Sequence, residues 1–157
     1  MENQRLVDEL VDARDALLGE LAAVSPESMT TPGLLGEWSA RELIAHLGYW
    51  AGHAVEIIHA AEDGRLEELG ADDPAVDDVN ETVARVARET DLATVRKREA
   101  ASVEVLVERL RALDPSLLAQ RLPDGASLAE GIGEDGAAHY RQHADELRAT
   151  IRERPHG

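Results

Sequence analysis

The sequence contains no cysteine and no phenylalanine, and Lys97 is its only lysine. The lack of cysteine excludes a disulfide scaffold, a thiolate metal site and a cysteine nucleophile, so any tight metal site must use His, Asp or Glu. Aromatic residues are almost as rare, and the whole set is Trp38, Tyr49, Trp50 and Tyr140. Ala, Leu and Val must therefore supply most of the core, which favours helices over sheets.

Long apolar runs and signs of secretion are also missing. No apolar run approaches the roughly 20 residues that a membrane helix needs, and the first ten residues mix acidic, basic and apolar side chains, unlike a signal peptide. We therefore expect a cytoplasmic protein that does not contact membranes. Its 157 residues fit a single domain over residues 1–157.

Positive charge is scarce as well. Lys and Arg number 16 against 32 Asp and Glu, which gives a formal net charge of −16. Such a surface repels phosphate backbones, and no basic stripe in the sequence opposes that repulsion. The composition therefore predicts that nucleic acid is not a partner.

Helical periodicity is the feature that the sequence does have. Apolar residues recur every three or four positions in four long segments. This pattern predicts helices over residues 3–24, 39–62 and 92–113, and a fourth helix that begins near Ser127 or after Gly133 and continues through residue 152. The start of the second helix is the clearest, because Ser39 and Glu42 form a capping box.

The connection between the second and third helices is long and acidic. It covers residues 63–79 and contains Asp72, Asp73, Asp77 and Asp78, and Asn80 is expected to cap a short helix over residues 81–88. The connection lacks the ligand spacing and central glycine of an EF-hand, and we interpret it as a solvated crossover. A crossover of this length leaves helices two and three parallel, so the expected fold is all-α, a four-helix bundle in up-down-down-up order.

Six histidines are the candidate functional residues. His139 and His143 are four residues apart in the fourth predicted helix, which places both imidazoles on one face, one turn apart, where they can share a metal ion. The residues between them lack the glutamate of an HExxH peptidase, so a zincin-type peptidase is disfavoured. His59 falls off the relevant face of the second helix and is expected to be exposed, and His156 lies in the tail.

A third ligand is expected from the second helix. His46 lies beside the apolar stripe of that helix, and three neutral imidazoles with an open position form the typical arrangement of a catalytic metal site. His53 follows two turns later on the same face, and it either lines the same cavity or replaces His46 as ligand. The residues alone also leave a purely structural role open for each histidine.

Two further side chains are candidates for the surroundings of the site. Asp135 precedes His139 by one turn, where it either orients that imidazole or is a solvent-facing acid. Trp50 either lines a substrate pocket with His53 or packs in the core. No general base or other catalytic residue can be named from the sequence.

The motifs around these histidines resemble those of a known family. The stretch GEWSARELIAHL over residues 36–47, followed by Tyr49 and Trp50, resembles the second-helix motif of the DinB/YfiT-like superfamily, and HYRQH over residues 139–143 resembles its fourth-helix HxxxH motif. The resemblance extends over nearly the whole chain. It implies an up-down-down-up four-helix bundle that binds a divalent ion, zinc or nickel, through His46, His139 and His143.

The resemblance also implies a class of function. The superfamily includes thiol S-transferases that use mycothiol, bacillithiol or related thiols, so we expect an enzyme that uses such a thiol as cosubstrate and an electrophilic small molecule as substrate. It also includes the N-terminal domain of mycothiol-dependent maleylpyruvate isomerase; the further C-terminal domain of that enzyme is not found here, so isomerase activity itself is not expected.

Alternatives to thiol transfer stay open at this point. They are a metal-dependent hydrolase, a self-resistance protein that opens a strained ring, and a non-catalytic bundle that binds a small molecule or a metal. Relatives often form dimers, so the resemblance is also consistent with a homodimer.

Overall fold

Helices account for most of the chain in the computed structural model, which describes residues 1–153. The α-helices are α1 (Glu2–Leu21), α2 (Ala40–Glu62), α3 (Val76–Arg88), α4 (Leu92–Ala112), α5 (Leu128–Asp135) and α6 (Ala137–Glu153), and short 3₁₀ helices are η1 (Leu66–Glu68) and η2 (Pro115–Ala119). Residues 1–153 contain no β-strand, only isolated bridges. The predicted all-α class is confirmed.

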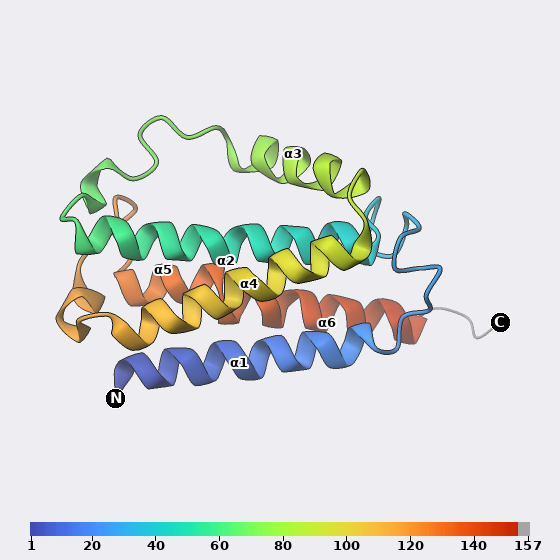
Figure 1. Ribbon diagram of the computed structural model, residues 1–157, viewed down its shortest axis with the longest axis horizontal. Helices are drawn as coiled ribbons and strands as arrows, with labels where there is room; N and C mark the ends of the chain where they lie inside the picture. Colours follow the sequence, from blue (N-terminus) through green and yellow to red (C-terminus); the bar gives the residue numbers. More distant parts are fainter. Residues whose placement is uncertain (154–157) are drawn as a thin grey trace.

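The long helices form a four-helix bundle in the predicted order. In Figure 1, α1 runs in one direction, α2 and α4 run in the opposite direction, and α5 and α6 return parallel to α1. Helix α2 packs on α4, and α1 packs on α6. The up-down-down-up topology is therefore confirmed, and α2 runs antiparallel to α6.

The predicted start of α2 is also confirmed. Ser39 is the N-cap, and its side chain and that of Glu42 form the expected reciprocal capping box. The Glu42 side chain is only 1% exposed, and Arg88 at the end of α3 lies 3.4 Å from its carboxylate. The same acid thus caps α2 and joins it to α3, which the sequence pattern did not predict.

The acidic crossover contains more helix than predicted. Helix α3 begins at Val76 rather than at residue 81, so the prediction that Asn80 caps a helix is wrong. Asp77 and Asp78 occupy the first turn of α3, where carboxylates stabilise a helix through its dipole. Asn80 lies within the helix, and its Oδ1 accepts a hydrogen bond of 2.9 Å from Trp50 Nε1 of α2.

The predicted fourth helix is interrupted. Ser127 caps α5 with a second capping box, so this start is confirmed, but the helix ends at Asp135 and α6 begins at Ala137. The residue between them, Gly136, has φ −107° and ψ −103°. A Cβ at this position would lie 3.0 Å from the Ile132 carbonyl oxygen and 3.4 Å from Leu10 of α1. The kink thus occurs at a position where a side chain would crowd both the preceding turn and α1.

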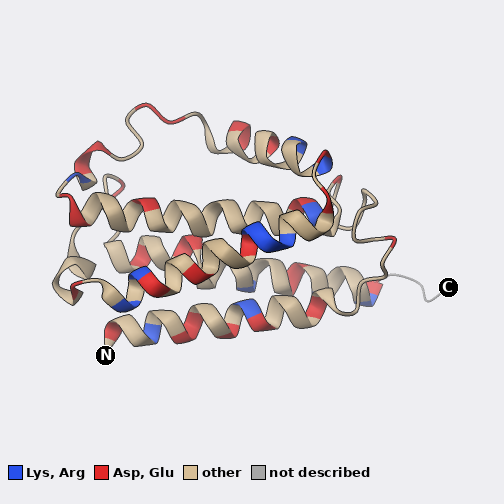
Figure 2. Cartoon of the chain, in the orientation of Figure 1, with Lys and Arg blue, Asp and Glu red and all other residues tan. Residues whose placement is uncertain are grey.

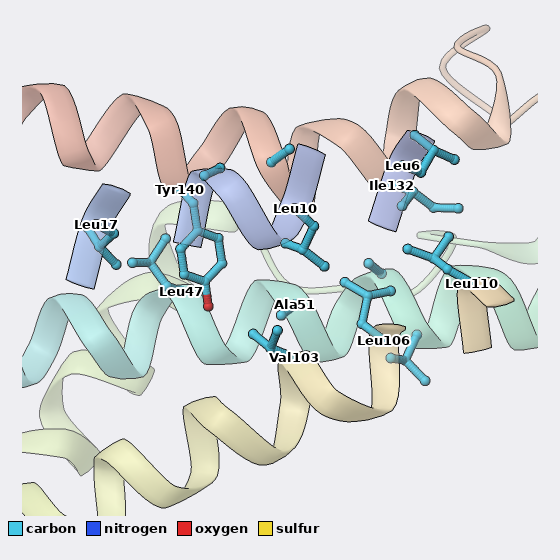
Figure 3. Close-up of a cluster of buried hydrophobic side chains, with 14 of the residues drawn as sticks. Leu6, Leu10, Leu17, Leu47, Ala51, Val103, Leu106, Leu110, Ile132 and Tyr140 are labelled. Carbon is cyan, nitrogen blue, oxygen red and sulfur yellow. The ribbon is translucent and has the colours of Figure 1, made fainter. Parts of the chain in front are cut away.

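The core between the helices is aliphatic and includes the buried carboxylate of Glu99. Figure 3 shows leucines of several helices around the ring of Tyr140. Glu99 of α4 is 5% exposed. Arg14 of α1 donates to both of its oxygens, at 2.8 and 2.7 Å, and the Tyr140 hydroxyl of α6 donates to it at 2.5 Å. These hydrogen bonds join three helices through one carboxylate.

The close packing of α2 on α4 depends on a glycine. A Cβ at Gly48 would lie 3.0 Å from the Glu99 Cα, whereas the nearest atom to a Cβ at Gly52, one turn later, is Ser102 Oγ at 4.0 Å. Gly48→Ala is therefore expected to lower the free energy of unfolding by about 1 kcal/mol, because an overpacking cost of about 1–3 kcal/mol exceeds the gain in helix propensity. Gly52→Ala, the matched control, is expected to raise it by about 0.5–1 kcal/mol. Urea unfolding measures both changes, and equal effects of the two substitutions would contradict the prediction.

None of the helices in the described part of the chain combines the length and apolar character of a membrane span.

Candidate metal centre

Three of the predicted ligands meet between α2 and α6. His46 of α2 and His139 and His143 of α6 each offer a ring nitrogen, and these atoms all lie within 4.8 Å of one another. The Nε2 atoms of His46 and His139 are 2.8 Å apart. The ring centroid of His46 is 4.6 Å from that of His139 and 5.3 Å from that of His143, and the centroids of His139 and His143 are 4.8 Å apart. The three imidazoles thus reach toward one another from α2 and α6, which run antiparallel (Figure 1).

Neighbouring side chains hold the imidazoles in place. The Trp38 ring, just before the α2 cap, packs on His46 with centroids 5.0 Å apart. Nδ1 of His143 lies 2.9 Å from a carboxylate oxygen of Glu146, one turn along α6. A carboxylate on the second nitrogen is a common way to fix a metal-binding imidazole. Neither Glu146 nor Trp38 was predicted as part of the site, although Glu146 follows His143 by three residues, a helical spacing at which the two side chains can meet.

The surroundings keep two of the rings neutral. Burial, and then the facing imidazoles of His139 and His143, lower the pKa of His46 to about 3. Burial, and then His143, lower the pKa of His139 to about 4. A histidine binds a metal only in its neutral form. The donor set of neutral nitrogens without thiolate fits a divalent ion of borderline softness, such as zinc or nickel.

These pKa values predict acid sensitivity of the metal-free protein. His46 and His139 titrate near pH 6.5 in the unfolded chain but only near 3 and 4 in the folded one. As the pH falls below 6.5, the unfolded state takes up protons that the folded state does not, and stability should fall by up to about 1.4 kcal/mol per pH unit for each histidine. Urea unfolding in the presence of a chelator at about pH 7 and pH 5 measures the slope.

A substitution isolates the contribution of one ring. His46→Gln should make the dependence of stability on pH shallower, because one suppressed protonation site is gone. His59→Gln is the control, since His59 is exposed on the same helix, as predicted. If the free energy of unfolding depends on pH with the same slope in the wild type and in His46→Gln, the lowered pKa of His46 is not a cause of the acid sensitivity.

The histidines line an open cavity. Its volume is about 520 Å³, and its lining includes all three imidazoles together with Trp38, Trp50, Val76, Asn80, Glu134, Asp135 and Gln142. Trp50 is half-buried and lines this cavity, with its indole nitrogen bonded to Asn80. A second cavity of about 670 Å³, lined by Leu34, Leu35 and Ala149 among others, reaches His143 and Trp38 from the other side. The imidazoles are therefore accessible to small molecules.

His53 does not join the three imidazoles. Its Nδ1 lies 2.6 Å from Asp135 Oδ2, and its ring packs edge-on against Trp50. The predicted contact of Asp135 with His139 is made by the Asp135 backbone, whereas the Asp135 carboxylate binds His53, 82 positions away in the sequence. Asp135 is the last residue of α5, directly before the kink at Gly136, and the His53 and Asp135 side chains meet there. His156 lies outside the described residues.

Comparison with solved structures shows the same fold in another protein. The chain superimposes on the crystal structure of the colibactin self-resistance protein ClbS in complex with a dsDNA, with a TM-score of 0.77 and 13% sequence identity, over 98% of this chain and 97% of the other. At this identity the likeness establishes the fold. No curated protein sequence matches the chain.

This likeness overturns the expectation that excluded nucleic acid, because a protein of the same fold has been crystallised with double-stranded DNA. Net charge sums the whole surface and does not report where the cations lie. Figure 2 shows a run of basic residues on α4, where Arg96, Lys97 and Arg98 are consecutive, within a chain of net charge −16. Composition was therefore the wrong basis for that exclusion.

The comparison with protein families matches the sequence to one family model. The matching model is that of the mycothiol maleylpyruvate isomerase N-terminal domain, and it covers residues 10–143. That range includes α2, with His46, and extends through His139 to His143. The DinB-like resemblance of the two motifs is thus confirmed, and the chain belongs to the mycothiol maleylpyruvate isomerase N-terminal domain family.

Proposed function

We propose that this protein is a divalent-metal-dependent thiol S-transferase that joins a low-molecular-weight thiol, such as mycothiol, to an electrophilic small molecule. The observation that carries the proposal is the convergence of His46, His139 and His143 within 4.8 Å on the wall of an open cavity. Membership of a family named for a mycothiol-dependent enzyme supports the choice of thiol.

The chemistry follows from the ligand set. A zinc or nickel ion held by three neutral imidazoles keeps its positive charge and lowers the pKa of a thiol or water that binds it. The chain itself supplies the rest: burial keeps the rings of His46 and His139 unprotonated, and Trp38 and Trp50 give the cavity apolar walls. In the reaction, the thiol sulfur bonds to the electrophilic carbon, the bond from that carbon to the leaving group breaks, and the thiol proton is released.

A second candidate is the detoxification of a reactive natural product by hydrolysis or ring opening. The fold of ClbS, a self-resistance protein, extends over 98% of this chain and supports this candidate. Both functions use the same cavity and the same three histidines. They differ in whether a thiol or water becomes bonded to the electrophilic carbon.

Two measurements on one preparation test the proposal. Elemental analysis of the untagged protein should find one zinc or nickel ion per chain, and incubation with a thiol and monobromobimane should give the thioether faster than the uncatalysed reaction. Loss of the electrophile without any added thiol would favour hydrolysis. Stoichiometric metal without turnover of any electrophile would indicate metal or ligand binding only, and protein purified and reconstituted without metal uptake would refute the metal centre.

A further inference from the structure

A second pair of titratable side chains adjoins the metal centre. His53 Nδ1 and Asp135 Oδ2 are 2.6 Å apart, with side-chain exposures of 33% and 17%. The Trp50 ring packs against the imidazole with centroids 5.0 Å apart. Within residues 1–153, the other ring nitrogen, Nε2, makes no hydrogen bond. The imidazole is therefore oriented on one side by a carboxylate and on another by an indole, and its second nitrogen is free to meet a ligand.

This pair lies at the boundary of two neighbouring cavities. His53 and Asp135 line a cavity of about 280 Å³ together with Leu69 and Leu122. Asp135 and Glu134 also line the cavity that contains the three imidazoles. A molecule bound against the metal centre can therefore extend to the pair. The seven residues from His46 to His53 separate their Cα atoms by about 10 Å along α2, which leaves room for a reacting carbon between them.

We propose that His53, held by Asp135, is the proton donor to the leaving group of the electrophile. The inference rests on the proposed thiol transfer. In a displacement, the sulfur approaches the carbon from one side and the leaving atom departs from the other, so an acid useful to the leaving atom must lie away from the nucleophile. As the sulfur–carbon bond forms, the bond to the leaving atom breaks and that atom takes the electron pair. His53 gives it the Nε2 proton, and the proton lost by the thiol restores the imidazolium through solvent.

The charges around His53 suit a donor. The carboxylate of Asp135 is the largest cause that raises the pKa of His53, and Asp73 of the crossover and Glu56 of α2 act in the same direction. Glu134 of α5 and Asp124 of the preceding loop line the same cavity. These carboxylates, which come from α2, α5 and two loops, therefore favour the protonated form of His53 that can donate a proton.

The experiment compares two electrophiles that differ in their need for a proton. With styrene oxide, the departing oxygen must be protonated, whereas with monobromobimane the departing bromide needs no acid. His53→Gln and Asp135→Asn holoenzymes should lose about 100-fold in kcat/KM with styrene oxide, in the usual range for loss of a general acid, and less than about 3-fold with monobromobimane. The exposed His59→Gln is the matched control and should retain both activities.

A direct readout accompanies the kinetics. NMR titration of the metal-free protein should give His53 a pKa above that of an ordinary histidine, and Asp135→Asn should lower it. Equal losses with both electrophiles, or an unchanged His53 titration in Asp135→Asn, would overturn the donor role and leave thiol transfer intact. A wild-type protein that conjugates neither electrophile would instead overturn the proposed function together with this role.

Discussion

Arg14→Met is expected to lower the free energy of unfolding by about 3 kcal/mol, the lower end of the cost of breaking a buried ion pair by removing one partner. Arg14 makes two hydrogen bonds to the Glu99 carboxylate, which is only 5% exposed. Without the guanidinium, only the Tyr140 hydroxyl remains bonded to that carboxylate. The lower end of the range applies because the Arg14 side chain is 23% exposed, so water can replace part of the lost solvation.

Thermal and urea unfolding together measure this loss. For a chain of this size, about 3 kcal/mol corresponds to a decrease in Tm of roughly 6–12 °C. Arg14→Met combined with Glu99→Gln should recover much of it, because the double substitution leaves no unpaired buried charge and keeps an acceptor for Tyr140. Arg148→Met is the matched control, because Arg148 of α6 also pairs with a glutamate of another helix, Glu20 of α1, but this ion pair is more exposed. A similar Tm for the wild type and Arg14→Met would show that the guanidinium does not stabilise the carboxylate.

His46→Ala and His139→Ala are each expected to abolish stoichiometric metal binding. Loss of a residue that merely orients a ligand lowers metal affinity by about 10–100-fold, so loss of one of three ligands should lower it on the order of 100-fold or more. Competition with a chromophoric chelator measures the affinity. Thermal unfolding provides a second readout, since an ion at 100 times its Kd stabilises the native state by about 2.7 kcal/mol, and this stabilisation should disappear in both variants.

The controls for this prediction are other histidines of α2. His59→Ala should bind the metal as the wild type does, because His59 is exposed and remote from the cluster. His53→Ala should also retain the metal, since His53 binds Asp135 and is not part of the cluster. The ligand assignment fails if His53→Ala loses the ion while His46→Ala keeps it.

The parts of the fold that the sequence predicted are those set by local pattern. Apolar periodicity located the helices of the bundle, and the Ser39 capping box located the start of α2. Of the two starts considered for the fourth helix, the structure has the one at Ser127. The His139–His143 pair followed from helix geometry alone. His46 required the family motif, because nothing local distinguishes it from His53. The two differ only in what they meet in the fold, since His46 faces His139 of α6 and His53 faces Asp135 of α5.

The parts that were not predicted depend on contacts between distant segments. The His53–Asp135 pair joins α2 to α5 and is visible only once the kink at Gly136 is known. Helix α3 begins a turn early because Asp77 and Asp78 favour a helix start. Glu99 did carry a signal, since it stands between Val95 and Val103 on the apolar stripe of α4, and all three are buried. A charged residue at such a position predicts a buried partner but does not identify Arg14.

Helix α3 forms one wall of the histidine cavity but is not one of the long helices of the bundle. It contributes Val76 and Asn80 to the lining, yet it packs mainly on α2 and buries only Ala84 and Ala87. Figure 1 shows it lying outside the four long helices. Replacements of Val76 can therefore change which molecules enter the cavity, while Asn80, which interacts with His46 and bonds to Trp50, stays in place. Substrate specificity can therefore diverge, in nature or by directed evolution, through changes in this helix while the four-helix bundle still folds.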